Sequence, residues 1–195
     1  CIIMNLIKFY TLLFLPTVFI LAGFILKKPK EEIRDDFKKY YDQYNVTGSF
    51  ILFDEKNNKY VYFNKEQKDE SFSPASTFKI CNSLIGLETG VIKDENFVIP
   101  WDGVKRAYEL WNKDHDLKSA FQNSTVWYYQ ELARRVGEER MNFWLKKSGY
   151  GNMDTTGGID MFWLTGGLRV TGGLRVTPSQ QTDFLQKLNH NKLSF

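Results

Sequence analysis

The first strong pattern in the chain is an apolar run from Phe9 to Leu26, with lysines on both sides. A positive charge followed by a hydrophobic stretch is typical of a secretory signal. The run of 18 residues is also long enough to remain as a membrane anchor. The pattern predicts that the protein is exported to the periplasm, that residues 1–26 are a signal peptide or an anchor, and that Met4 is the first translated residue.

The next two patterns predict a helix and a hairpin. Residues 31–44 carry apolar side chains at helical intervals, which predicts an amphipathic helix. Residues 47–64 hold two runs of β-forming residues around a polar tip at 56–58, which predicts a β-hairpin. A polar loop is expected at 65–73. Because two strands do not form a stable sheet alone, either helices cover the hairpin or further strands follow Phe195.

The rest of the chain predicts helices and one long loop. A helix begins near Ser76 and ends at Gly90, and a long glycine-bearing loop, of a length that is usually functional or disordered, begins at Tyr150. The sequence Gly-Gly-Leu-Arg-Val-Thr then occurs twice in tandem, at 166–171 and 172–177, which indicates a short duplication and not a repeat fold. Three more helices are predicted at 117–136 with a break near Ser124, at 138–148 before Gly149, and at 177–190 behind a capping box.

The composition fits one packed domain. The chain has 195 residues, of which 43% are hydrophobic and 16% aromatic, and these values exclude intrinsic disorder. Positive and negative residues are interleaved and give a net charge of +3, so no basic block indicates a nucleic-acid partner. We expect no disulfide, because Cys1 precedes Met4 and leaves Cys81 alone, and no metal, because His115 and His190 are isolated.

Ser76 and Lys79 form a Ser-x-x-Lys pair at the start of a predicted helix. Positions i and i+3 lie on one helix face, so both side chains can point into one cleft. A serine hydroxyl needs a base before it attacks, and lysine is a base only when burial, here among Phe78, Val126 and Trp163, removes its charge. Taken alone the motif is short, and two interpretations stay open: an exposed helix start without a role, or a nucleophile beside its base.

Further motifs accompany this pair. They are Ser124-Thr125-Val126, Tyr150-Gly151-Asn152 and Trp163, together with the tract 100–121. In order and spacing they resemble the class D serine β-lactamases, the oxacillinases, from about residue 31 to the end of the chain. The resemblance implies an α/β fold of the α+β type, the penicillin-recognising serine β-lactamase fold, in which a helical region packs on an antiparallel sheet.

The resemblance also implies a role for each matched residue. Ser76 would be the nucleophile that a β-lactam antibiotic acylates, and Lys79, carboxylated by carbon dioxide or bicarbonate, would be the general base. Ser124 would relay a proton to the leaving nitrogen, and Trp163 would donate its indole N–H to the lysine carbamate. The other matched residues would form an apolar wall and the loop beside the substrate, without a metal or bound cofactor: Val126, Tyr150 and Asn152.

Two features depart from the family pattern. No Lys-Thr-Gly or Lys-Ser-Gly triplet follows Trp163, so we expect residues 27–195 to be an incomplete domain that lacks C-terminal strands and about half of an oxyanion hole. The tandem duplication beside Trp163 would either bulge outward or displace the indole.

Three alternatives to a hydrolase stay open. The chain could be a β-lactam sensor domain that keeps its acyl group, a penicillin-binding transpeptidase, or an inactive remnant that does not fold. Such sensors carry several membrane spans, and the single apolar segment of this sequence argues against that alternative.

Overall fold

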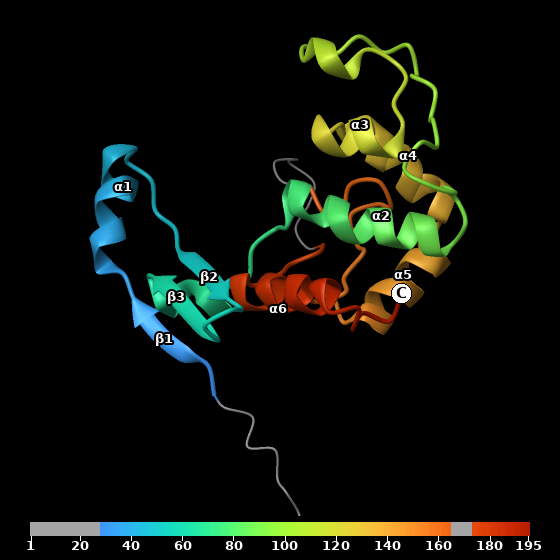
Figure 1. Ribbon diagram of the computed structural model, residues 1–195. Helices are drawn as coiled ribbons and strands as arrows, with labels where there is room; N and C mark the ends of the chain where they lie inside the picture. Colours follow the sequence, from blue (N-terminus) through green and yellow to red (C-terminus); the bar gives the residue numbers. More distant parts are fainter. Residues whose placement is uncertain (1–27, 165–172) are drawn as a thin grey trace, which may run out of the picture.

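The computed structural model describes residues 28–164 and 173–195 and consists of a small sheet beside a group of helices (Figure 1). The predicted signal or anchor and the first copy of the tandem duplication therefore lie outside the described residues. The strands are β1 (Lys30–Ile33), β2 (Phe50–Asp54) and β3 (Lys59–Phe63). The α-helices are α1 (Lys38–Gln43), α2 (Phe78–Glu88), α3 (Leu117–Gln122), α4 (Val126–Val136), α5 (Glu138–Ser148) and α6 (Pro178–Asn189).

The predicted hairpin is confirmed. β2 pairs with β3 in antiparallel fashion, from Phe50 opposite Phe63 to Asp54 opposite Lys59. The Asp54 carboxylate accepts hydrogen bonds from the backbone and side-chain amides of Asn57, at 3.1 and 2.6 Å. These bonds close the polar tip, as the local sequence predicts.

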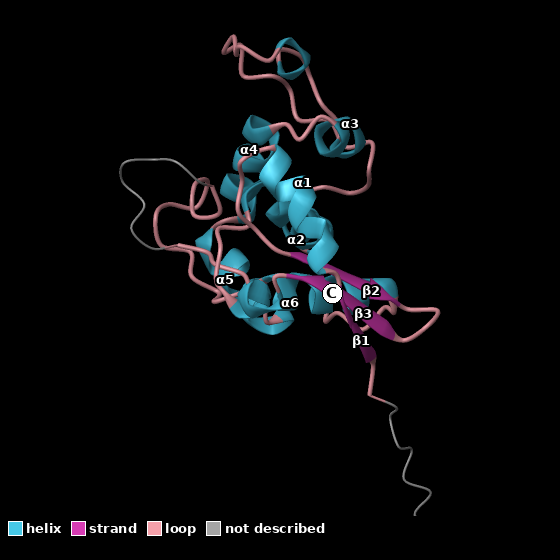
Figure 2. Cartoon of the chain, turned by 90° about the vertical axis from the view of Figure 1, so that its left-hand side faces the viewer, coloured by secondary structure: helices cyan, strands magenta, loops and turns pink. Residues whose placement is uncertain are grey.

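The helix predicted for residues 31–44 is only partly correct. Its first residues form β1, which pairs with β3 in parallel fashion and makes a mixed sheet of order β1-β3-β2 (Figure 2). Lys59 Nζ lies 2.6 Å from a carboxylate oxygen of Glu32, and the Arg34 N–H donates to the Tyr62 carbonyl at 2.7 Å. Hydrogen bonding to the edge of β3 thus determines the structure of these first residues, and the predicted α-helix forms only at α1. β1 is also the third strand that the hairpin needs.

The helices pack around α2. Its neighbour α4 approaches closely at Gly86, where an added Cβ would lie 2.9 Å from a Leu132 methyl group. A side chain at this position would push the two helices apart. Phe78, Cys81 and Ile85 on α2 are fully buried. The close approach matters for the site, because α2 and the turn before α4 carry the polar residues described below.

Most predicted helix ends are confirmed. The expected break near Ser124 separates α3 from α4, and Gly149 ends α5 with a φ of +63°. Thr177 and Gln180 form a capping box at the start of α6, as predicted. The polar loop at 65–73 differs slightly, since Lys65–Asp69 form a short 3-10 helix.

α6 connects the two parts of the molecule and extends from the sheet to below α2 (Figure 1). The side-chain amide of Gln186 donates to the Tyr60 hydroxyl on β3 at 2.9 Å. At the other side, the Phe184 ring meets Tyr150 edge-on at 4.9 Å. In the described ranges, no helix is long and apolar enough to cross a bilayer.

Candidate active site

Ser76 and Lys79 lie together at the start of α2. Ser76 belongs to a 3-10 turn, Ala75–Thr77, that leads directly into the helix. Lys79 Nζ lies 2.8 Å from Ser76 Oγ. Ser76 is exposed, whereas only 2% of Lys79 is accessible to solvent. The pair therefore presents a hydroxyl to the surface and an amine to the interior.

The burial of Lys79 changes its acid–base chemistry. Removal from water penalises the ammonium form and lowers the pKa of Lys79 from its ordinary value of 10.5 to about 8. About a tenth of such an amine is neutral at pH 7, against less than about a thousandth of an ordinary lysine. Lys79 can thus accept a proton near physiological pH, and a neutral amine can also react with carbon dioxide.

Ser124 contacts the same serine from the turn between α3 and α4. Its hydroxyl donates to Ser76 Oγ at 3.0 Å. The backbone of Ser124 is left-handed, with a φ of +51°. Two backbone bonds hold this conformation: Ser124 N–H to the Phe121 carbonyl at 3.1 Å and Thr125 N–H to the Ala120 carbonyl at 2.9 Å. Non-glycine residues seldom adopt such a φ, and when they do the position is often functional.

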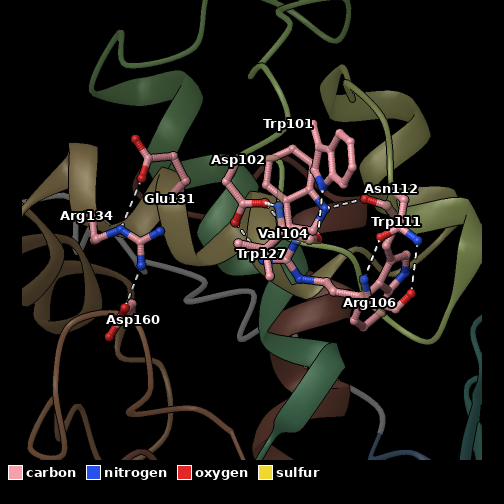
Figure 3. A network of polar contacts seen from close by, with 10 residues as sticks. All are labelled: Trp101, Asp102, Val104, Arg106, Trp111, Asn112, Trp127, Glu131, Arg134 and Asp160. Carbon is pink, nitrogen blue, oxygen red and sulfur yellow. Dashed lines mark hydrogen bonds and ion pairs between the residues drawn. The ribbon is translucent and has the colours of Figure 1, made fainter.

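A polar network that includes Arg106, Trp111 and Trp127 (Figure 3) reaches the backbone next to Ser124. The Trp111 indole N–H donates to the carbonyl of Asn123 at 2.9 Å, and the Trp127 indole N–H donates to the carbonyl of Trp111 at 2.8 Å. Arg106, paired with Asp102 at 2.6 Å, lies over the Trp127 ring at 5.7 Å. The loop that carries Trp111 thereby braces the turn that presents the Ser124 hydroxyl.

Trp163 lies beside the pair on the long loop. Its carbonyl accepts hydrogen bonds from the Ala75 N–H and the Ser73 hydroxyl, both at 3.0 Å. Its ring packs on Phe78 with centroids 5.3 Å apart. The side chain is fully buried, and its Nε1–H has no hydrogen-bond partner in the described structure. A buried donor of this kind is costly unless an acceptor joins it.

The turn before Trp163 is fastened to α4. The Gln130 side-chain amide donates to the Asp160 carbonyl at 3.2 Å, and an Arg134 guanidinium nitrogen lies 2.5 Å from the Asp160 carboxylate (Figure 3). α4 therefore supports both the Ser124 turn at its start and the Trp163 loop along its length.

The other three predicted residues have supporting positions. Val126, half-buried, is the first residue of α4. The Tyr150 hydroxyl donates to Gln181 at 2.8 Å. The Asn152 amide binds the backbone of residues 173–175, where the Arg175 N–H donates to Asn152 Oδ1 at 2.9 Å. Tyr150 and Asn152 thus hold the loop against α6 and the segment before it.

One neighbour of the amine was not predicted from the sequence. The ring centroid of Tyr129, on α4, lies 5.5 Å from Lys79 Nζ. Tyr129 follows Val126 by three residues and so shares its helix face. That spacing was the available signal, but only the packing of α4 on α2 brings the ring to the amine.

The described residues offer no cluster of three or more His, Cys, Asp or Glu side chains for a metal ion. Both ring nitrogens of His115 are engaged, with the Leu110 carbonyl and the Ser119 hydroxyl, each at 3.0 Å. The groups that the site does bring together are an exposed hydroxyl, a buried amine of lowered pKa, and a second hydroxyl.

Comparisons with known proteins agree with this chemistry. Residues 37–194 match the family model "Penicillin binding protein transpeptidase domain". The chain is 43% identical over 170 residues to the probable β-lactamase YbxI of Bacillus subtilis, and the match covers 87% of this chain and 59% of that protein. A solved class D β-lactamase, YbXI from Nostoc, is 43% identical with a TM-score of 0.74, over 82% of this chain and 65% of that one.

A receptor domain is similar as well. The C-terminal domain of the Bacillus licheniformis BlaR penicillin-receptor is 34% identical with a TM-score of 0.77, over 87% of this chain and 66% of that chain. The present chain thus spans 59% of the curated relative and about two thirds of the two solved chains.

Proposed function

The chain belongs to the class D serine β-lactamases, within the penicillin binding protein transpeptidase family, and we propose that it hydrolyses the β-lactam ring of penicillin-type antibiotics through an acyl-serine. The observation that carries the proposal is the buried amine of Lys79, 2.8 Å from the exposed hydroxyl of Ser76. A nucleophile and a base within hydrogen-bond reach are what acyl transfer requires.

Each polar residue has a step in this reaction. The Ser76 hydroxyl passes its proton to the Lys79 side chain, 2.8 Å away, as its oxygen attacks the lactam carbonyl carbon, and the carbon–nitrogen bond of the ring then breaks. The Ser124 hydroxyl, 3.0 Å from Ser76 Oγ, passes a proton to the departing nitrogen. A water molecule then cleaves the ester, which restores Ser76 and releases the opened antibiotic. The N–H of Ser76, in the first turn of a helix, is free of an intrahelical acceptor and is suited to the carbonyl oxygen.

The surroundings of Lys79 fit carboxylation by carbon dioxide. The amine is buried and its lowered pKa, about 8, leaves part of it neutral and nucleophilic. The Trp163 Nε1–H, buried without a partner in the described structure, is a donor suited to an added carboxylate. When carboxylated, Lys79 supplies a general base for the formation and the hydrolysis of the acyl-serine. The residues around Lys79 exclude water from Nζ and hold Nζ beside Ser76.

A second candidate is a β-lactam sensor that is acylated and keeps its label. The likeness to the BlaR penicillin-receptor domain favours it. Both candidates use Ser76 as the acylated residue and differ only in how fast the ester is hydrolysed.

Incubation of the purified chain with a fluorescent penicillin tests these proposals. Fast label turnover with accumulation of hydrolysed penicillin is the expected result. A label that persists on Ser76 for hours would instead support the sensor. Absence of label from folded protein, at protein and penicillin concentrations that label a known class D enzyme, would contradict both. Ser76→Ala is the control, because it removes the attacking oxygen and leaves Lys79 in place.

We also propose that the protein is exported, because the apolar run from Phe9 to Leu26 follows a lysine and precedes two more. Fractionation of cells that express the chain tests this proposal. Recovery outside the cytoplasm is expected, and deletion of residues 1–26 should return the protein to the cytoplasm.

A further inference from the structure

Tyr129 borders the Lys79 amine and has no role in the mechanism above. Its ring centroid lies 5.5 Å from Lys79 Nζ, within the range of a cation–π contact. The side chain is fully buried on α4. The amine thus contacts the ring of this tyrosine, while the tyrosine hydroxyl lies 3.0 Å from the Ser83 hydroxyl.

The direction of two hydrogen bonds shows why this hydroxyl is not a proton source for the amine. The Ser83 hydroxyl donates to the carbonyl of Lys79 at 2.7 Å. It lies 3.0 Å from the Tyr129 hydroxyl. Because a serine has one hydroxyl proton, Tyr129 must donate and Ser83 must accept. The hydroxyl proton of Tyr129 is therefore used in the hydrogen bond to Ser83, and this bond fixes the position of the ring.

The same face of α2 holds the tyrosine backbone. The Asn82 side-chain amide donates to the carbonyl of Tyr129 at 3.2 Å. Positions 79, 82, 83 and 86 share one side of α2, and at Gly86 the missing side chain lets α4 come close. α2, the helix that carries the amine, consequently holds Tyr129 both at its backbone carbonyl and at its side-chain hydroxyl.

We propose that Tyr129 is a positioning residue: its ring, held by the hydrogen bond to Ser83, fills the interior side of the space around Lys79 Nζ and keeps the amine against Ser76. This inference deepens the proposed function and rests on it for its purpose, but the arrangement itself can be tested without any β-lactam.

The ring acts on the amine in two opposing ways. Its face attracts an ammonium group, whereas its bulk excludes water and so favours the neutral amine. Burial is the only cause of the lowered pKa of Lys79, with no contribution from a neighbouring charge in the described structure. Of the two groups that contact the amine among the described residues, Ser76 is neutral, and Tyr129, whose pKa burial raises to about 12, stays neutral up to about pH 11.

Substitutions separate these two effects. Tyr129→Leu keeps an apolar wall and removes the ring face, so the midpoint of Lys79 titration should fall by about half a pH unit. Tyr129→Ala admits water, so the midpoint should rise by about one pH unit or more. Tyr129→Phe keeps the ring, and its midpoint should stay within about 0.3 pH unit of wild type. The matched control is Val136→Ala, which trims a buried side chain at the last residue of the same helix, seven positions from Tyr129.

Cyanate provides the readout, because it is a small electrophile that carbamoylates only neutral amines. Its incorporation at Lys79 is measured by peptide mass spectrometry between pH 6 and 11 and is normalised to exposed lysines such as Lys56. The wild-type midpoint should lie near 8. Midpoints that move down in Tyr129→Leu and up in Tyr129→Ala, with the Val136→Ala midpoint unchanged, support the proposal. The Leu variant alone decides if the Ala variant does not fold.

A midpoint within about 0.3 pH unit of wild type for Tyr129→Leu overturns the positioning role. The same protein samples are labelled with fluorescent penicillin. If penicillin never labels Ser76 while the cyanate midpoints shift as expected, the proposed function fails and the positioning role stands.

Discussion

The Ser124 hydroxyl donates to Ser76 Oγ at 3.0 Å from a backbone in the left-handed region, with a φ of +51°. The contact joins residues 48 positions apart in the sequence. It depends on the turn between α3 and α4, which the Trp111 indole braces through the carbonyl of Asn123. Ser124 therefore combines a hydrogen bond to Ser76 with a strained backbone conformation, and substitutions can separate the effect of the hydroxyl from the effect of the strain.

We expect Ser124→Gly to be more stable than Ser124→Ala by about 1 kcal/mol, because only glycine adopts this φ without strain. Both variants lose the hydroxyl, so both should lose about 10²–10³-fold in the rate of acylation by penicillin. Urea unfolding and stopped-flow labelling measure the two effects. If either variant acylates within threefold of wild type, Ser124 is not the proton relay.

Lys79→Met should abolish hydrolysis and stabilise the fold. The folded-state pKa of Lys79, about 8, lies below its ordinary value of 10.5. Below pH 8 the buried charge therefore lowers the free energy of unfolding by up to about 3 kcal/mol. The unfolded chain binds more protons between pH 8 and 10.5, so wild-type stability rises with pH across that window. The advantage of the methionine variant should hence be greatest below pH 8 and vanish by about pH 10.5. Denaturant midpoints at pH 7, 9 and 10.5 provide the comparison, and a constant difference would refute this account.

Trp163→Phe should make activity depend on added bicarbonate. The ring remains, but the Nε1–H that would bond a carboxylated Lys79 is lost, and a hydrogen bond to a charged group contributes about 1.5–3 kcal/mol. Roughly 10–100-fold more bicarbonate should therefore be needed for half-maximal activity. Trp144→Phe, a substitution of a buried tryptophan on α5, is the control for packing loss. Equal bicarbonate curves for the two variants would remove Trp163 from the proposed reaction.

Gly151→Ala should be far more damaging than Gly149→Ala. Both glycines have a positive φ, of +58° and +63°, so an alanine costs about 1 kcal/mol of strain at each. At Gly151 the new Cβ would also lie 2.1 Å from the Arg175 carbonyl oxygen, whereas at Gly149 nothing lies within 4 Å. We expect a loss of roughly 3 kcal/mol or more for Gly151→Ala. Thermal unfolding measures the stability of both variants. Equal losses of stability would mean that the backbone at Arg175 moves aside without an energetic cost.

Local sequence chemistry predicted the elements whose causes are local. The Asn57 turn, the glycine end of α5 and the Thr177 capping box each follow from a few neighbouring residues. β1 was missed because its stability comes from the edge of β3, whose pairing residues lie 29 positions away, as Lys30 opposite Lys59 illustrates. The spacing of apolar residues within 31–44 carries no information about hydrogen-bond partners that lie so far along the chain.

The site divides in the same way. The spacing of Ser76 and Lys79 on one helix predicts their contact, which the structure has at 2.8 Å. Ser124 and Trp163 were identified only through the resemblance to a known family, since their approach depends on long-range packing. Tyr129 escaped both routes, because its position follows from how closely α2 and α4 approach at Gly86.

The early place of β1 in the chain limits where the predicted signal could be cleaved. β1 begins at Lys30, only four positions after the apolar run ends at Leu26. A peptidase that cuts at or before Lys28 leaves every backbone partner of β3 intact. A cut three or four residues later removes part of a strand and exposes the edge of β3 to neighbouring molecules. Cleavage of the predicted signal must therefore fall before Lys30 to keep the three-stranded sheet whole.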